Sequence, residues 1–261
     1  MGAYLPLAAI FLSSMTGGGL SLQPEGKWNL DTREKSCVLQ RAFSGDSQPW
    51  SVAILPHPGF LRMELLLTRH TRPNRRAGDK AKLTIRPSGA VFQGDVQTTA
   101  SADAAVTYHV SVDPSLLAAL SSATDMEIAV DRAPMISLPL PSMAAATTAL
   151  EACEQDLLLS WGVDPARFRS VLPLDKLRGF PTSADYPAGA SGASGRVVLL
   201  LELNTSGKVT SCALIESSGN AVLDQQTCNI ALSRMLYPPL LDANGTPTTS
   251  WIMFGFRWVA P

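Results

Sequence analysis

The chain has 261 residues, and 46% of them are hydrophobic, which is enough to form one large core or two ordinary ones. Its 21 basic and 22 acidic side chains leave a formal charge of -1. A chain so nearly neutral has no net field that would gather nucleic acid, so we expect no nucleic-acid partner.

Residues 1–22 are predicted to be a leader for export. The first charged residue is Glu25, and the apolar run AYLPLAAIFL fades into serine, threonine and glycine. This composition is typical of a signal peptide that is cut between Gly18 and Leu22. The alternative is a retained inner-membrane anchor, because an uncharged stretch of about 20 residues can just span a bilayer. Both interpretations place the protein in the periplasm, and the second associates it with the membrane through its N-terminus.

Four cysteines, an even number in a chain that is expected to be exported, indicate disulfide bonds. Four cysteines allow three pairings. The pairing that keeps each bridge within one domain joins Cys37 to Cys153 and Cys212 to Cys228, and the alternative is four free thiols. No two cysteines have the spacing of a zinc site, and no histidine neighbours them, so we expect no metal there.

Residues 26–172 are predicted to form a β-rich N-terminal domain. Short alternating segments are separated by clusters of Gly, Pro, Asp and Ser, which is typical of an antiparallel sheet, a sandwich or a partial barrel. The expected strands lie at 36–43, 50–56, 60–67, 81–86, 90–97, 105–112, 125–131 and 135–140.

Two helices are expected in this domain. Asp113 as N-cap and Pro114 in the first turn start a short helix, and Ser142 starts an alanine-rich helix that Gly162 closes. Cys153 lies on the apolar face of the second helix. A bridge from this cysteine to the first strand would therefore clamp the helix onto the sheet.

A segment rich in Pro, Gly, Ser and Ala, residues 173–184, is expected to link this domain to a second domain at 185–261. In the second domain RVVLLLELNTSGKVTSCALIE indicates a hairpin with a tight turn. Residues from Asn220 to Met235 form the stripe of a helix, and TSWIMFGFRW alternates as a closing strand. The order is strand, strand, helix, strand, and the whole chain is of the α+β class.

Several motifs of the second domain are similar to those of a known family. They are Tyr186-Pro187, GRVVLLLELNTSGKV, SSG followed by Leu223-Asp224, YPPLLDANGTP and the aromatic closing strand. Together they resemble the C-terminal domain of the TonB family, the periplasmic end of energy transducers that engage outer-membrane transport receptors. The resemblance covers about residues 184–261 and includes the variant in which the second strand is bridged to the helix.

The resemblance implies a non-enzymatic domain that adds an extended segment of a protein partner, such as an outer-membrane receptor, to a sheet edge. Candidate edges are the closing strand, 251–258, and the first strand, 196–203. The residues expected to contact the partner are Tyr186, Pro187, Trp251, Met253 and Arg257. For the Tyr-Pro pair, the alternative is a bend that leads the chain into the first strand. The late disulfide would stabilise so small a domain by about 3 kcal/mol.

The chain departs from the transducers of this family in its N-terminal part. It lacks their charged cytoplasmic start, firm membrane helix and long Pro-rich spacer, so the resemblance does not extend to coupling with the proton gradient. One alternative function is a structural or assembly factor of the cell envelope that self-associates through its C-terminal domain. A third is an exported enzyme with its site in the N-terminal domain.

No catalytic residue and no cofactor is predicted. The stretch GASGASG precedes a strand rather than a helix, so we interpret it as a linker and not as a phosphate loop. His57, His70 and His109 each lie far from other metal-ligating residues. No Ser, His and Asp combination has a distinguishing spacing. The basic run from Arg69 to Lys82 is expected to be a solvated turn, with contact to anionic lipid as the alternative.

Overall fold

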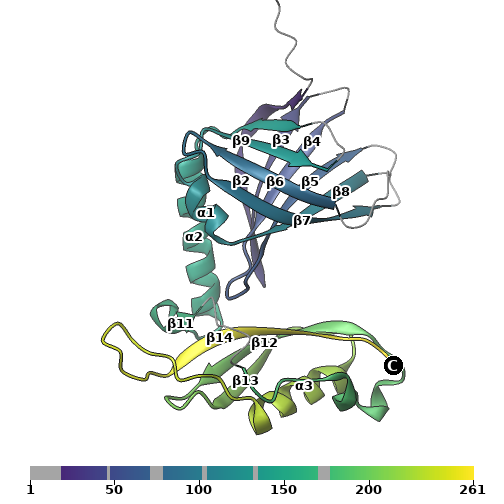
Figure 1. Cartoon of the computed structure of the whole chain (residues 1–261), viewed down its shortest axis with the longest axis vertical. Helices are drawn as coiled ribbons and strands as arrows, with labels where there is room; N and C mark the ends of the chain where they lie inside the picture. The colour runs from purple at the N-terminus through teal and green to yellow at the C-terminus, as the bar shows by residue number, and fades with distance from the viewer. Residues whose placement is uncertain (1–18, 46–47, 71–78, 102–104, 132–134, 170–176) are drawn as a thin grey trace, which may run out of the picture.

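The computed structural model describes residues 19–45, 48–70, 79–101, 105–131, 135–169 and 177–261. Within them the chain forms a sheet of ten strands and a sheet of four. Figure 1 shows the larger sheet above the smaller one, with helix α2 (Met143–Ser160) running from the first toward the second. The predicted α+β class, with a β-rich N-terminal domain and a small ββαβ unit, is confirmed.

The larger sheet contains every strand that was predicted between residues 36 and 140. Its strands are β1 (Leu20–Ser21), β2 (Gln23–Arg33), β3 (Ser36–Ser44), β4 (Trp50–Leu55), β5 (Met63–His70), β6 (Asp79–Arg86), β7 (Val91–Ala100), β8 (Ala105–Val112), β9 (Asp125–Val130) and β10 (Ile136–Pro139). Their order in the sheet is β1-β10-β9-β6-β7-β8-β5-β4-β3-β2. Inward-facing residues alternate along the strands; Met63, Leu65 and Leu67 of β5, for example, are all buried.

The N-terminal segment closes this sheet into a barrel. β1 pairs with β10 at one end of the strand order, and β2 pairs with β3 at the other. Only Leu22 separates β1 from β2; it is fully buried, and its N–H donates to the Ser137 carbonyl at 2.9 Å. One continuous segment therefore pairs with both ends of the strand order, through β1 with β10 and through β2 with β3. The sequence did not predict β2, whose residues are mostly polar.

The expected leader falls largely outside the described residues, which begin at Gly19. Its last residues, from Leu20 to Leu22, belong to the barrel. Among the helices of the described residues, none is long and apolar enough to cross a bilayer.

Two helices accompany the barrel, as predicted. The short helix α1 (Ser115–Leu120) begins one residue after Pro114, and the Asp113 carboxylate accepts a hydrogen bond from the Ser115 N–H at 2.9 Å. Helix α2 ends before Gly162, whose φ of +75° suits a residue without a side chain. The disulfide between Cys37 and Cys153, with Cα atoms 6.2 Å apart, fastens α2 to β3.

The smaller sheet has the predicted elements in the predicted order. They are β12 (Gly195–Leu203), β13 (Val209–Glu216), helix α3 (Ala221–Arg234) and β14 (Ser250–Trp258). An unpredicted two-residue strand, β11 (Phe168–Arg169), pairs in parallel with the start of β14, and the sheet order is β11-β14-β12-β13. Helix α3 packs against β12 and β13, and its apolar residues share a core with one face of the sheet.

The start of α3 explains why the motifs SSG and LD occur together. Asn220 caps the helix by accepting hydrogen bonds from two backbone N–H groups of the first turn. The Asp224 carboxylate accepts from the Ser217 hydroxyl and from both the N–H and the hydroxyl of Ser218. Burial by itself would raise the pKa of Asp224, but these hydrogen bonds outweigh it and lower the pKa.

A glycine is required in the β12–β13 hairpin. Gly207 has a φ of +82°, and a Cβ atom there would collide with the Tyr237 carbonyl oxygen. The Tyr237 N–H in turn donates to the Gly207 carbonyl at 2.9 Å. The turn and the YPPLLD motif, far apart in the sequence, therefore hold one another in place.

The N-terminal domain covers the face of the small sheet that α3 leaves free. A separate apolar cluster forms there from the end of α2, the following loop and the sheet; its buried members are Leu158, Val163, Phe168 and Leu200. The half-buried side chains of Trp251 and Met253 pack against this cluster. The small sheet thus lies between α3 and the N-terminal domain. Of the predicted linker, residues 173–176 lie outside the described residues, and Leu177 belongs to the C-terminal core.

Candidate functional site

Among the described residues, the outer edge of β14 is unpaired along most of its length. β12 pairs with β14 from Ser250 to Trp258 on one side. On the other side β11 pairs only with Trp251 and Ile252. In the part of the chain that the structure describes, no residue pairs with the outer edge of β14 from Met253 to Trp258. An unpaired strand edge can accept another strand.

The expectation that the first strand of the small sheet is also an exposed edge is wrong. β12 lies between β14 and β13 and pairs with both. Its residues from Val197 to Leu201 are all buried, because both faces of the sheet are covered at this strand. A continuous run of apolar residues, VVLLL, is typical of such a central strand.

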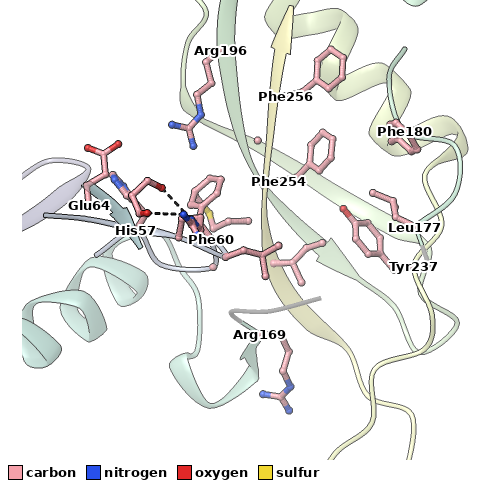
Figure 2. A pocket seen from close by; sticks show the side chains of 17 residues that line it. His57, Phe60, Glu64, Arg169, Leu177, Phe180, Arg196, Tyr237, Phe254 and Phe256 are labelled. Carbon is pink, nitrogen blue, oxygen red and sulfur yellow. Dashed lines mark hydrogen bonds between the residues drawn. The ribbon is translucent and has the colours of Figure 1, made fainter. Parts of the chain in front are cut away.

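A cavity of about 560 Å³ lies along the open part of β14. The residues that line it come from both domains: His57, Gly59, Phe60, Leu61, Arg62, Glu64, Ser111, Arg169, Leu177, Phe180, Arg196, Tyr237, Ile252, Met253, Phe254, Gly255 and Phe256. Figure 2 shows β14 between two groups of these side chains, one from the N-terminal domain and one from the C-terminal domain. We call this cavity the edge groove.

One wall of the edge groove is apolar and aromatic. Phe254 and Phe256 of β14 point toward Leu177, Phe180 and Tyr237 (Figure 2). Tyr237 is 3% exposed, and burial raises the pKa of its phenol, which therefore stays neutral. Phe180, at 48% exposed, leaves much of its ring in contact with solvent. This wall offers apolar surface beside free backbone groups.

The other wall comes from the loop between β4 and β5 and from the start of β5. It carries His57, Phe60, Arg62 and Glu64. The pKa of His57 is lowered by burial and by Arg196, against an opposing effect of Glu64, so its imidazole is neutral at neutral pH. Among the described residues no group of three potential metal ligands occurs.

The comparisons with known proteins bear on the smaller of the two domains. Residues 183–259 match the family model described as Gram-negative bacterial TonB protein C-terminal. The C-terminal domain is TonB-like. The resemblance identified in the sequence is thus confirmed over the same residues. No curated protein and no solved structure matches the chain.

The TonB-like domain contributes β14 and Tyr237 to the edge groove, whereas the wall around Phe60 lies outside the matched residues. That wall carried no motif in the sequence. Phe180 and Leu177 also precede the match, in a segment that the sequence indicated as linker. Besides β14, two motifs signalled parts of the groove: YPPLLD contains Tyr237, and GRVVLLLELNTSGKV contains Arg196.

The residues predicted to contact a partner fall at different places. Met253 lines the edge groove, Arg257 is exposed farther along β14, and Trp251 packs at the contact between the domains. Tyr186 packs edge-on against Trp258, with ring centroids 6.0 Å apart, and its hydroxyl donates to the Ala193 carbonyl at 2.8 Å. Pro187, the residue after it, leads into a short 3-10 turn. The structure thus gives Tyr186 contacts within the domain.

The disulfide between Cys212 and Cys228 joins β13 to α3, with Cα atoms 6.0 Å apart. β13 lies at the opposite side of the four-stranded sheet from the open edge of β14. The bridge therefore stabilises the TonB-like domain without occupying the groove. With the other bridge it accounts for all four cysteines.

The remaining sequence motifs do not contribute to the groove, apart from His57. The stretch GASGASG leads through a short turn into β12. Of the basic run, Arg69 lies on β5, and Lys80 and Lys82 lie on β6, while residues 71–78 lie outside the described residues. His109 lies on β8, where its Nδ1 is 3.7 Å from the Glu64 carboxylate.

The segment that carries Phe180 is fastened to the end of α3. Arg234 donates from Nε to the Gly179 carbonyl at 3.0 Å and forms an ion pair with Asp185. Arg178 exchanges backbone hydrogen bonds of 3.0 Å with Leu236. These contacts hold the aromatic wall of the groove against the TonB-like domain.

Asp185 should make this fastening sensitive to acid. Its side-chain hydrogen bond with Arg234, together with bonds from Thr182, lowers the pKa of Asp185 from 3.8 to about 2. A carboxyl whose pKa is depressed by folding stabilises the protein above pH 3.8, and this contribution is lost as the pH falls toward 2. Because Arg234 is partly exposed, solvent screening reduces the contribution to about 1 kcal/mol.

We therefore expect Asp185→Asn to lower the free energy of unfolding at pH 7 by about 1 kcal/mol and to have little effect near pH 2. Urea denaturation of the full chain at both pH values measures the difference. Asp242→Asn is the control, and we expect it to lower the free energy of unfolding less than Asp185→Asn does. Asp242 lies in a loop beyond α3, where its carboxylate accepts hydrogen bonds from nearby backbone N–H groups. An equal loss at both pH values would contradict the role assigned to the Asp185 carboxylate.

Proposed function

We propose that this chain is a non-enzymatic periplasmic protein that binds an extended segment of a partner protein by β-strand addition along β14. The observation that carries the proposal is the outer edge of β14 from Met253 to Trp258, which lies open beside the edge groove. Strand addition gives affinity through main-chain hydrogen bonds and specificity through pockets for alternate side chains. The edge of β14 would supply the main-chain hydrogen bonds, and the two walls of the groove would supply the pockets for side chains.

The family match supports a role in transport across the cell envelope. Residues 183–259 match the family model of the C-terminal part of Gram-negative bacterial TonB proteins, and we infer from this likeness that the partner belongs to the cell envelope. In this chain the TonB-like domain is docked onto a barrel rather than carried on a long spacer. We therefore propose that the domain recognises an extended segment of a partner, and we do not propose that it couples to the proton gradient.

A photocrosslinking amino acid at Arg257, which is exposed on β14, tests the proposal in the native envelope. We expect it to capture a partner whose crosslinked peptide, identified by mass spectrometry and synthesised, binds the purified full chain. The matched control places the same probe at Leu214, which is 48% exposed on β13 at the other side of the sheet. Capture from Arg257 but not from Leu214 is the expected result.

Groove variants complete the test. Phe180→Ala is expected to weaken binding of the captured peptide about tenfold, because a half-exposed ring of the apolar wall is lost. Leu241→Ala is the control, since Leu241 is 52% exposed in the same domain and does not line the groove. Equal effects of the two variants would contradict the proposal. Capture only of a second copy of this chain, from Leu214, would favour self-association instead.

A further inference from the structure

We propose that the edge groove selects a partner segment in which apolar and acidic residues alternate, and that the N-terminal domain supplies the wall on the acidic side. The inference rests on strand addition along β14 and deepens it by assigning the chemistry of the partner. It also gives a role to a domain that the family match leaves out. Three features of the groove carry it: the seating of the N-terminal wall, the distribution of charge, and the alternation of side chains along β14.

Two glycines allow the N-terminal wall to touch β14. Gly59 has a φ of +80°, and a Cβ atom there would lie 2.7 Å from the Cβ of Met253. On β14 itself, a Cβ atom at Gly255 would lie 2.9 Å from the Phe60 ring. The loop and the strand are therefore in direct contact, and the groove is formed by both domains.

This wall is fixed to the barrel before any partner binds. Arg62 donates from Nη2 to the Ser111 carbonyl at 2.6 Å and to the Asp95 carboxylate at 2.8 Å. The Phe60 N–H donates to the His57 carbonyl at 3.0 Å and closes the turn. A wall that is already ordered loses little conformational entropy on binding, which favours selectivity.

The described lining of the groove carries three arginines and one carboxylate, Glu64, which lies 3.7 Å from His109 Nδ1, so positive charge is in excess there. Arg62 is paired with Asp95, but Arg196 stacks on the Phe60 ring at 4.9 Å, and no carboxylate pairs with it among the described residues. Arg169 donates only to backbone carbonyls in that same part of the chain. Opposite charges about 4 Å apart attract one another even near a protein surface. An acidic segment therefore complements the groove, and a basic one does not.

Figure 2 shows Arg196 and Arg169 toward opposite ends of the open edge. In register, Arg196 pairs with Arg257 and Arg169 with Ile252. Along the strand direction, a strand added from Met253 onward would thus begin next to Arg169 on the same edge and end at the level of Arg196, which lies across β14 on β12. Another arginine, Arg257, is exposed at the far end of the same edge.

The alternation of a β-strand decides where acidic residues belong. Side chains of an added strand lie on the same face as their neighbours across the ladder. On one face these neighbours are Phe254 and Phe256, which point to the apolar wall. On the other face they are Met253, Gly255 and Arg257, and Arg196 pairs with Arg257 across the ladder. The groove accordingly fits an added strand whose odd-numbered positions are apolar and whose even-numbered positions are acidic, or the reverse.

Three labelled synthetic peptides test the inference on the full chain by fluorescence anisotropy. The first alternates valine with glutamate, the second alternates valine with lysine, and the third has the composition of the first with its glutamates clustered at one end. We expect the first to bind at least tenfold more tightly than either of the others. Its affinity should also fall as the salt concentration rises.

Variants test which residues of the groove cause the preference for glutamate over lysine. Arg196→Glu is expected to abolish or reverse the preference for glutamate over lysine, whereas Lys208→Glu, the same charge change at an exposed turn of the same domain, is expected to preserve it. Leu61→Ala, in the N-terminal wall, should weaken the first peptide several-fold. Leu159→Ala is its control, because Leu159 is 58% exposed in the same domain and does not line the groove. Circular dichroism confirms that each variant is folded.

The outcomes separate this inference from the proposed function. Binding of all three peptides with similar affinity, weakened by Phe180→Ala but not by Arg196→Glu or Leu61→Ala, would leave strand addition standing and overturn the inference. Failure of every peptide to bind at millimolar concentration would overturn the inference, while crosslinking from Arg257 would still decide whether a partner uses this edge. A tenfold preference that Arg196→Glu removes supports both.

Discussion

Replacing Cys37 and Cys153 together with alanine is expected to lower the free energy of unfolding by about 5 kcal/mol. The bridge joins residues 116 apart in the sequence, and a closed loop of that length removes much conformational entropy from the unfolded chain. Alanine is preferred to serine because the two sites are 1% and 6% exposed, and a buried hydroxyl would add a separate cost. Urea denaturation of the oxidised full chain measures the change.

The second bridge provides the matched control. Cys212 and Cys228 are only 16 residues apart, so the same double replacement there is expected to cost about 3 kcal/mol. The two losses should therefore rank by loop length, and both should disappear when wild type and variants are compared under reducing conditions. A larger loss for the short loop would show that local packing, rather than loop closure, dominates the contribution of these bridges.

Trp258→Ala is expected to destabilise the TonB-like domain by about 3–5 kcal/mol. Trp258 is 1% exposed at the end of β14, and its ring packs against Tyr186 and Phe256. Its Nε1–H donates to the fully buried Thr227 hydroxyl at 2.8 Å, and that hydroxyl donates to the Leu223 carbonyl. A domain of this size has a thin core, so we expect its transition to occur at a much lower urea concentration.

Thr227→Val separates the hydrogen bond of the Trp258 indole N–H from the packing of the Trp258 ring. Valine keeps the volume at position 227 but leaves the indole N–H without its acceptor, which should cost about 1–3 kcal/mol. Denaturation of the full chain, followed by circular dichroism, compares the two variants with wild type. If Thr227→Val were as destabilising as Trp258→Ala, the hydrogen bond rather than the ring volume would account for the stability of this end of β14.

The local elements of this chain could be predicted because their signals are local. The eight strands between residues 36 and 140 alternate with period two, and α3 begins at Asn220, whose side chain satisfies the first N–H groups of the helix. The within-domain cysteine pairing followed from the division into two domains. The TonB resemblance followed from motifs such as SSG and LD, whose side chains bind one another at the start of α3.

The elements that were missed have weak local signals. β2 is mostly polar, so nothing in its sequence indicates a strand, and it is formed by pairing with β3. β11 has two residues and exists because it pairs with β14. β12 was taken for an edge because alternation does not reveal which neighbours a strand has, although its run of five buried apolar residues fits a central position.

The sequence by itself determined most of the elements, their order and the resemblance of the C-terminal domain, because periodicity, capping and motif spacing act between residues that are close in the chain. Only the tertiary structure decided that β12 is central, that no described residue pairs with the outer edge of β14 beyond Ile252, and that Phe60 and Arg196 meet beside it. Those contacts join residues more than a hundred positions apart. They depend on how two folded domains pack, and a sequence pattern carries no record of that packing.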